Sequence, residues 1–418
     1  MTLGTADFWT APLSALSGVD ITDARFKANP FPFYARLREE APVFPVTLRR
    51  LRCEERAWLV TRYGDVLAVL RDDATFVKDP HKAMTPAQLR RVPSVPAVFG
   101  PLGRNLLSLD GADHDRLKVL VHRAFTPRMV ERMRDQTQAV TDEALDRALR
   151  RSGMDLIADF ALPVPLRVIG RILGVPGRDH GRFSAWTRAF VSVGHRSPLT
   201  VIPSVLAFIR YLRGLIRERR ARPRNDLTSA LVAAQEGSDT LTDDEVLAMI
   251  FLLLSAGHET TVNLIGSGTL ALLGHPDQME RLRDDPALMG SGVEELARFV
   301  VPAETATERY AARDVEVAGT LIPRGELVVA VLASANRDPA QFERPDTLDL
   351  GRANNRHLSF GQGMHYCLGA PLSRMEAQVA LTTLLRRAPN LRLRVPEGQL
   401  RWRSGFILRG LEALPVTL

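Results

Sequence analysis

One cysteine stands among three glycines near the C-terminus, in the segment Phe360-Gly-Gln-Gly-Met-His-Tyr-Cys367-Leu-Gly369. A helical pattern, Leu368 to Arg387, follows this cysteine at once. The amides in the first turn of a helix lack partners within the helix, and together with the helix dipole they stabilise a thiolate. Glycines at 361, 363 and 369 let the backbone adopt conformations closed to other residues and lie against a flat ligand. A thiolate held in such a loop can ligate an iron.

A second chemical segment interrupts a long apolar run. Thr242-Asp-Asp-Glu245 has the form of a capping box, and the residues after it predict a helix of about thirty residues, roughly 45 Å long. A helix of that length crosses the whole molecule and has to be largely buried. Its middle reads Ala256-Gly257-His-Glu259-Thr260-Thr261. Glycine costs about 1 kcal/mol against alanine in a helix, so this segment suits a functional groove; a polar kink, or a threonine bonding its own backbone, is the structural alternative.

A third pattern, Glu295-Leu-Ala-Arg298, places an acid and a guanidinium three residues apart. The two side chains share one helical face, which suits a buried, charge-assisted pair. By itself this spacing is more often a surface ion pair.

The elements that position these groups are mostly helical. Strand patterns are short: 58–61, 315–318, 327–331, 391–395 and the C-terminal hydrophobic residues. Amphipathic patterns predict helices at 112–125, 127–151, 156–173, 201–222 and 287–300. Because helices and strands do not alternate, the sequence predicts a mainly α chain of the α+β class, helix-rich with small β-sheets. No linker or internal repeat divides it, so a single domain over residues 1–418 is expected.

Composition restricts the compartment and the partners. The 418 residues include two cysteines, Cys53 and Cys367, which argues for a reducing compartment. The best apolar run, 246–256, has about eleven residues against the roughly 18 that a membrane span needs, so no membrane anchor and a cytoplasmic location are expected. The net charge is +7, but the arginines are spread along the chain without an aromatic-interleaved basic patch. Nucleic acid is therefore not expected as a partner, and the charge indicates a solvated face or a docking surface for an acidic electron donor.

The spacing Phe-Gly-x-Gly-x-His-x-Cys-x-Gly resembles the haem-binding loop of the cytochrome P-450 superfamily. The 256–260 segment resembles that family's oxygen-activating groove, and Glu295 with Arg298 resembles its core pair. Residues 335–352 resemble the meander before the haem loop, except that Thr347 stands where many relatives carry a basic residue, and Arg352 is a candidate replacement. The resemblance covers essentially the whole chain. It implies the P-450 fold, with haem between a long central helix and the helix that follows the cysteine loop.

The resemblance also implies roles for individual residues. Cys367 is the implied iron ligand of haem b (iron protoporphyrin IX), and its thiolate pushes electron density toward O–O cleavage. Thr260 and Glu259 are the implied catalytic pair, with Glu259 relaying protons from solvent. The implied partners of the haem propionates are His114, Lys118, Arg309 and His365. Further implied cofactor contacts are Phe360, Gly361, Gly369, Ala256 and Gly257. The implied substrate-lining residues are Leu252, Ser255, Ala256, Ala303, Thr305, Phe406 and Ile407, together with the loops 82–106 and 190–202.

The implied function is that of a soluble, bacterial-type haem-thiolate monooxygenase. It would activate O₂ with electrons from a separate ferredoxin or flavodoxin and its NAD(P)H-dependent reductase, because the chain shows no flavin- or nicotinamide-binding module. Basic residues flank the cysteine loop and predict an acidic donor: Arg116, Lys118, Arg123, Arg128 and Arg356. The substrate would be a medium-sized hydrophobic molecule, such as a polyketide or macrolide, fatty acid, terpenoid or steroid, to be hydroxylated or epoxidised in secondary metabolism.

Two other functions compete with this interpretation. A peroxide-driven fatty-acid peroxygenase is the first, but such relatives carry Arg-Pro where this chain has Glu259-Thr260. A haem-thiolate protein that only binds or senses a ligand is the second, and an intact proton-relay pair argues against it.

Overall fold

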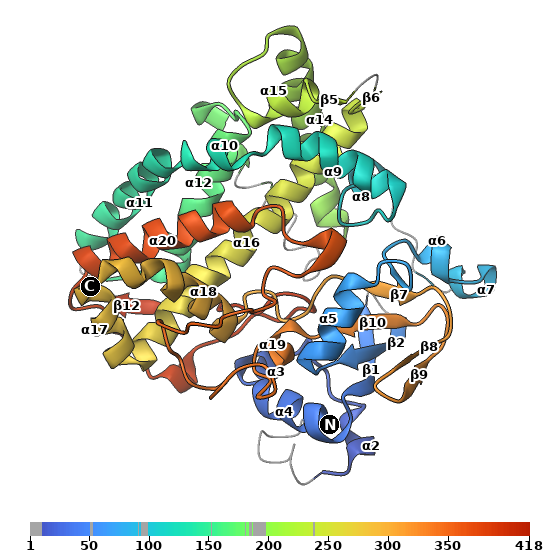
Figure 1. Cartoon of the computed structure of the whole chain (residues 1–418). Coiled ribbons are helices and arrows are strands. Elements are labelled where there is room, and N and C mark those ends of the chain that lie inside the picture. Colours follow the sequence, from blue (N-terminus) through green and yellow to red (C-terminus); the bar gives the residue numbers. More distant parts are fainter. Residues whose placement is uncertain are drawn as a thin grey trace.

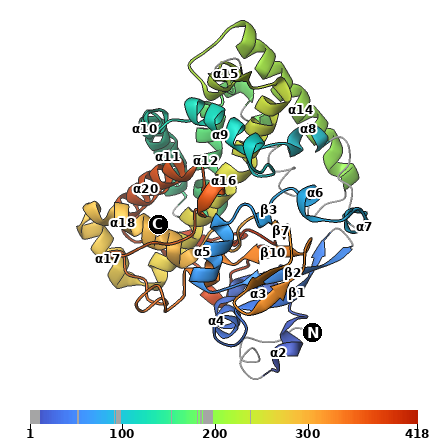
Figure 2. The ribbon, with the colours of Figure 1, turned by 45° about the vertical axis from the view of Figure 1, so that its right-hand side comes forward.

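The structure is a computed structural model that describes residues 11–50, 53–90, 92, 99–151, 153–179, 181–183, 186, 198–236 and 239–418. Most helices gather on one side of the molecule, and the larger β-sheet lies on the other (Figures 1 and 2). Helix α16 (Asp243–Gly274) runs through the middle of the helical side, with α20 (Ala370–Arg387) next to it. The predicted α+β class with few, small sheets is confirmed.

Helix α16 has 32 residues, which is about 48 Å. The predicted capping box forms, since the Thr242 side chain accepts from the Glu245 amide and the Glu245 carboxylate accepts from the Thr242 amide. The first half of α16 packs in one apolar cluster with α9 (Ala112–Ala124) and α14 (Pro198–Ala221). The second half packs in another cluster, with α11 (Arg134–Leu149) and α18 (Met289–Val300). Residues 255–261 lie between these two clusters.

The apolar part of α16 is longer than the run at 246–256 predicted from the sequence. Among the described residues, α16 is the one helix long and apolar enough to cross a membrane, judged by length and composition alone. Within its most apolar 18-residue window, 61% is buried inside the protein. Core packing therefore accounts for its apolar composition.

The larger sheet has five strands in the order β1-β2-β10-β7-β3. Strands β1 and β2 form a long antiparallel hairpin, β10 pairs with β2 in parallel, and the other pairs are antiparallel. The strands are β1 (Val43–Arg50), β2 (Cys53–Val60), β3 (Phe76–Val77), β7 (Arg309–Ala311) and β10 (Leu327–Ala330). This sheet and the helices before it enclose the third apolar cluster.

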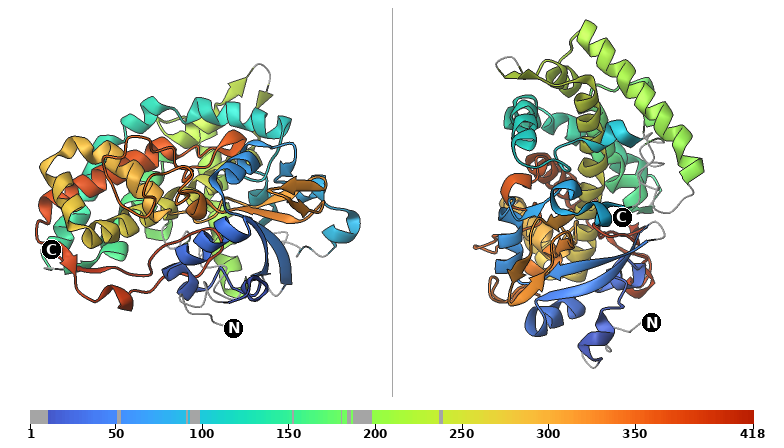
Figure 3. Two further views of the ribbon diagram at one scale, coloured as in Figure 1. Left: turned by 60° about the horizontal axis from the view of Figure 1, so that its bottom comes forward. Right: turned by 90° about the vertical axis from the view of Figure 1, so that its right-hand side faces the viewer.

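The second sheet joins the middle of the chain to its end. Its strands β11 (Arg392–Leu393), β12 (Pro415–Thr417) and β4 (Gly153–Asp155) are antiparallel. The two-stranded ribbons are β5 (Gln235–Glu236) with β6 (Asp239–Thr240), and β8 (Val315–Val317) with β9 (Thr320–Ile322). Figure 3 shows α14, in light green, running along the outside of the molecule.

The remaining helices are mostly short. On the sheet side lie α2 (Leu13–Leu16), α3 (Ala24–Ala28), α4 (Phe31–Glu40), α5 (Tyr63–Arg71), α6 (Pro80–Ala83), α7 (Pro86–Leu89) and α19 (Leu332–Ala335). The helical side also holds α8 (Gly100–Gly103), α10 (Pro127–Glu131), α12 (Pro163–Ile172), α15 (Leu227–Val232) and α17 (Pro276–Asp284).

Several predicted boundaries differ from the structure, and the helix predicted over 156–173 is a π-helix (Ile157–Ala161) followed by α12. The helix predicted over 127–151 is divided into α10 and α11, with Thr126 capping the first through its hydroxyl. The strand predicted at 58–61 is the end of the much longer β2. The helix predicted to start at Leu368 begins at Ala370, so Cys367 precedes its first turn.

A buried network surrounds Glu295 on α18. Arg298 donates two hydrogen bonds to the Glu295 carboxylate, at 2.7 and 2.8 Å, and both side chains are fully buried. Arg352 contributes a second guanidinium to the same carboxylate, at 3.1 Å. Arg298 also donates to the backbone carbonyls of the meander, those of Asn336, Pro345 and Thr347. One buried carboxylate therefore fixes the loop that leads to the cysteine, with Arg352 in place of a side-chain cation at Thr347.

Glu295→Ala should destabilise the protein by about 3 to 5 kcal/mol, because it leaves two guanidiniums without their buried partner. The midpoint of urea unfolding measures this loss, and haem content after purification should fall with it. Glu316→Ala, which changes an exposed acid on β8, is the matched control and should alter stability by less than about 0.5 kcal/mol. Equal urea midpoints for the two variants would contradict the central role of Glu295.

Candidate active site

The cysteine loop is tight and packs on helix α5. Gly361 and Gly363 have φ of +70° and +74°, a region that favours glycine. A Cβ on Gly363 would lie 2.4 Å from the Leu70 carbonyl oxygen, so no larger residue fits there. The Cys367 amide donates to the Phe360 carbonyl at 2.9 Å, which closes the loop. Two of the three glycines predicted to shape this loop therefore have a direct geometric reason.

The Cys367 side chain is accessible, yet its surroundings are desolvating. Burial raises the pKa of the thiol, while the amides of Gly369 and Ala370 and the charge of Arg374 lower it. These amides open helix α20, as the helix-terminus argument predicts. The local amides therefore stabilise the thiolate in part. A cation in direct contact with the sulfur would be needed to offset the cost of burying its charge.

The polar segment of α16 presents one face that its neighbours leave uncovered. Leu252, Ser255, Ala256, Glu259 and Thr260 follow the i, i+3, i+4, i+7, i+8 pattern of a single helical face. Ala256 is exposed in the middle of this helix, although adjacent turns are buried. The Thr260 hydroxyl donates to the Ala256 carbonyl at 2.9 Å, so its oxygen keeps lone pairs free to accept. His258, the neighbour of Glu259, is buried, and its ring nitrogen Nδ1 lies 2.6 Å from the Leu254 carbonyl oxygen.

Four basic residues predicted from separate parts of the chain come together beside the cysteine loop. The rings of His114 and His365 are 4.7 Å apart, and Lys118 donates to the Met364 carbonyl at 2.7 Å. Arg309 on β7 is 2% exposed, and its Nε has no partner among the described residues; the same holds for Nε2 of His365.

Lys78 is a fifth basic group that the sequence analysis missed. Its ammonium is buried and donates to the carbonyls of Thr307 and Glu308, at 3.0 and 2.9 Å. Burial, and then the charges of Lys78, Arg309 and His114, lower the pKa of His365 to about 2. Burial also lowers the pKa of Arg309 to about 10, with Asp73 and Asp110 opposing. Three acids, Asp73, Asp110 and Glu308, act on these charges. Nε of Arg309 and Nε2 of His365 nevertheless lack hydrogen-bond partners among the described residues, so the cluster fits an anionic ligand.

The predicted substrate-lining residues beyond α16 also lie together. The hairpin of residues 401–412 carries Phe406 and Ile407, and the Ile407 carbonyl accepts from the Glu304 amide at 2.7 Å. Thr305 donates its hydroxyl to the Phe406 carbonyl, and Ala303 forms a β-bridge with Leu408. One continuous wall therefore holds all four positions. Two further loops that we expected to line this site, 82–106 and 190–202, lie partly outside the described residues.

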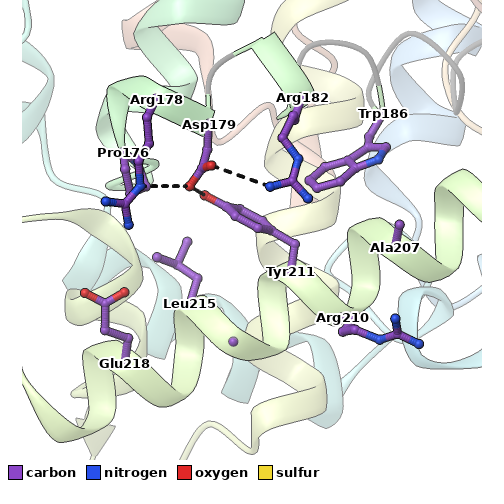
Figure 4. A pocket seen from close by; sticks show the side chains of 11 residues that line it. Pro176, Arg178, Asp179, Arg182, Trp186, Ala207, Arg210, Tyr211, Leu215 and Glu218 are labelled. Carbon is purple, nitrogen blue, oxygen red and sulfur yellow. Dashed lines mark hydrogen bonds and ion pairs between the residues drawn. The ribbon is translucent and has the colours of Figure 1, made fainter.

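A separate surface pocket of about 380 Å³ lies between α14 and residues 176–186. There Tyr211 donates to Asp179 at 3.2 Å, and Arg178 and Arg182 flank the same carboxylate (Figure 4). None of the predicted site residues lines it, so this hollow is not the candidate active site.

Comparison with known proteins explains why these groups converge. A family model described as Cytochrome P450 matches residues 205–399. The polyketide biosynthesis cytochrome P450 PksS of Bacillus subtilis is 40% identical over 393 residues, which is 94% of this chain and 96% of that protein. The chain belongs to the cytochrome P450 family. The solved structure of PksS superposes on this P450 with a TM-score of 0.89, covering 96% of this chain and 99% of PksS.

Two other relatives show the range of this group of P450s. The mycinamicin IV hydroxylase/epoxidase of Micromonospora griseorubida is 43% identical over 385 residues, covering 92% of this chain and 94% of that enzyme. The myxobacterial P450 CYP267B1, solved in complex with myristic acid, is 40% identical with a TM-score of 0.87, covering 95% of this chain and 98% of that one. The predictions of a cytochrome P-450, and of an oxidoreductase of bacterial secondary metabolism, are confirmed at the level of the family.

Haem is the cofactor of this family, and the residues present fit it. Its two carboxylates would supply acceptors for Nε of Arg309 and Nε2 of His365, which lack hydrogen-bond partners among the described residues. The accessible sulfur of Cys367 offers a soft ligand for iron. The uncovered Ala256 and the small Gly257 on α16 allow a flat group to approach closely.

Cys367→Ser should abolish the ferrous–CO absorption band that gives P450s their name, because a hydroxyl does not supply the thiolate. Far-UV circular dichroism should stay unchanged, which separates ligand loss from unfolding. Cys53→Ser is the control, and it should keep the band. Loss of the band in Cys53→Ser with its retention in Cys367→Ser would show that the ligand assignment is wrong.

Proposed function

We propose that this P450 hydroxylates or epoxidises a medium-sized hydrophobic substrate, with electrons from a separate ferredoxin or flavodoxin and its reductase. The observation that carries this proposal is the uncovered face of α16, where an acid and an alcohol stand beside an otherwise apolar wall. When bound through Cys367, haem iron would supply the activation of O₂. The protein then has to orient the substrate, exclude water and deliver protons.

Thr260 and Glu259 would deliver the protons. The Thr260 hydroxyl is anchored to the Ala256 carbonyl, which fixes the direction of its remaining lone pairs. Burial raises the pKa of Glu259, and Arg403 lowers it. An acid whose pKa is moved toward neutrality exchanges protons more readily at physiological pH than an ordinary glutamate does. The intact acid–alcohol pair favours O₂-driven chemistry over the peroxide-driven alternative.

The substrate class follows from the wall and from the relatives. Leu252, Ala303, Phe406 and Ile407 present apolar surface, while Ser255 and Thr305 both spend their hydroxyls on backbone carbonyls. Few polar groups remain to select a charged ligand, so a largely apolar molecule fits best. One relative is named for mycinamicin IV, PksS is named for polyketide biosynthesis, and a third binds myristic acid, which all agree with this class.

A spectral binding screen tests the substrate class. Macrolides, polyketide intermediates, fatty acids, terpenoids and steroids are titrated into the haem-loaded protein. A ligand that displaces the iron-bound water shifts the Soret absorption, and we expect a macrolide or polyketide to give the largest shift. Each hit is then supplied with a surrogate ferredoxin, reductase and NADPH. A ligand that is bound without ever raising NADPH consumption would instead support a binding or sensing protein.

Thr260→Ala should preserve haem and substrate binding but reduce product formation by about 10² to 10⁴, the usual contribution of acid–base assistance. NADPH consumption should continue, with its electrons diverted to hydrogen peroxide. The measured quantity is product formed per NADPH consumed. Thr269→Ala is the control, because that hydroxyl also bonds its own helix but is buried in the second half of α16. Unchanged coupling in Thr260→Ala would remove Thr260 from proton delivery.

The electron donor would dock beside the cysteine loop. Of the basic residues expected there, Arg116 is already paired with Asp239 and Glu245, and Arg123 donates to the Gln235 carbonyl. Arg128 and Arg356 are exposed and are the better candidates for contact with an acidic donor. Complementary charge of this kind mainly accelerates encounter.

Arg128→Glu and Arg356→Glu should each slow reduction by ferredoxin and flatten its salt dependence, without changing substrate affinity. The Debye length is about 8 Å at physiological ionic strength, and salt largely screens the attraction between charges that are farther apart. The wild-type reduction rate should therefore fall steeply as salt is added. Arg386→Glu, at the far end of α20, is the control and should behave as wild type. If the rate is independent of salt and both reversals are silent, the donor docks on another face.

A further inference from the structure

The acid of the proton relay has a cationic partner from a distant part of the chain. Arg403 lies 3.5 Å from the Glu259 carboxylate, nitrogen to oxygen. The Glu259 side chain is 13% exposed and that of Arg403 39%, so solvent screens the pair mainly from the Arg403 side. Nothing in the sequence patterns pointed to Arg403, because 144 positions separate it from its partner and no motif includes it.

The hairpin that carries Arg403 is held firmly against α16. The Arg403 amide donates to the Gly410 carbonyl at 2.9 Å, and Trp402 and Leu411 form a β-bridge next to it. A Cβ on Gly410 would lie 1.9 Å from Oδ1 of Asn263, one turn after Glu259 on α16. Only glycine permits this approach. The close contact fixes where Arg403 lies along α16 relative to Glu259.

Arg409 anchors the base of the hairpin to the N-terminal part of the chain. Arg409 is buried, stacks 3.8 Å from the Trp402 ring, and donates to the carbonyls of Lys27 and Ala28. The tip of the same hairpin carries Phe406 and Ile407. The segment that supplies the cation is therefore also a segment of the proposed substrate wall.

We propose that Arg403 is a positioning residue for proton delivery: it holds the ionised Glu259 at the edge of the groove and releases it when the acid takes up a proton. An ionised carboxylate is attracted to the guanidinium and stays beside it. A protonated one is not, and its side chain is free to turn toward Thr260 on the next position of the helix. The hairpin that lines the substrate site thereby also sets the position of the Glu259 carboxylate between proton transfers. This inference rests on the proposed monooxygenase function.

The electrostatic surroundings of Glu259 are simple enough to test this. Among the described residues, Arg403 is the one charged group that acts on the Glu259 carboxylate, and burial acts against it. The neighbouring His258 is buried, and burial together with the charge of Arg403 keeps it neutral at physiological pH. Removing Arg403 should therefore raise the pKa of Glu259, so that its proton is retained to higher pH.

Arg403→Gln should slow product formation about tenfold, a part of the 10² to 10⁴ that acid–base assistance contributes. Product formed per NADPH consumed depends on pH through Glu259, and the midpoint of that dependence should rise by about 1 pH unit. The reason is that an opposite charge at this distance commonly shifts a pKa by that much or more. That dependence is identified as the part lost in Glu259→Gln. Arg403→Lys should restore most of the wild-type pH profile. Arg401→Gln is the matched control, because Arg401 is an exposed arginine in the same hairpin. It should change neither the rate of product formation nor the pH dependence.

A double-mutant cycle separates positioning from structural support. In a Glu259→Gln background, Arg403→Gln should have no further effect on product per NADPH. Additive effects of the two changes, or a pH profile in Arg403→Gln equal to that of Arg401→Gln, would overturn the inference. If Arg403→Gln does not fold, Arg403→Met in both backgrounds gives the same comparison, because it also removes the charge and keeps a long side chain. Silent Thr260→Ala and Glu259→Gln variants would remove the acid–alcohol relay on which this inference rests, whereas the absence of any oxygenated product in the wild type would refute the proposed function itself.

Discussion

The structure depends on one constraint: helix α16 has to be buried along about 48 Å while its middle stays uncovered. Its two halves satisfy this by packing in two separate apolar clusters, and the small and polar residues 255–261 span the gap between them. The cysteine loop, the cation cluster and the substrate wall all come from other parts of the chain, and they are arranged around this gap. A helix that was apolar throughout would have packed more tightly and left no room for a ligand.

Elements with strong local signals could be predicted from the sequence. The capping box at Thr242, the glycines that shape the cysteine loop, and the spacing of Glu295 and Arg298 each depend on short-range geometry. The β1–β2 hairpin was mostly missed, because Pro45 and the charged residues around 49–56 conceal the strand pattern. Its strands are stabilised by pairing with each other and with β10, which no local pattern reports. The split of the 127–151 helix likewise reflects tertiary packing.

The candidate site divides in the same way. Residues that belong to a motif, such as Cys367 and Thr260, were found by spacing. Lys78 and Arg403 were missed, since each acts through a partner far away in sequence: Lys78 through the 307–308 backbone, and Arg403 through Glu259. The physical signal that marks each of them is a charged side chain in contact with a distant segment of the chain. That signal exists only after the chain has folded.

The pairing of β12 with β4 joins Thr417 to Gly153, residues about 260 positions apart, a separation that makes contacts form late. A chain emerging from the ribosome therefore has α16 available well before the cysteine loop and the hairpin of residues 401–412. Until that hairpin packs, the groove lacks one side. A flat cofactor thus has an open route toward α16 during synthesis.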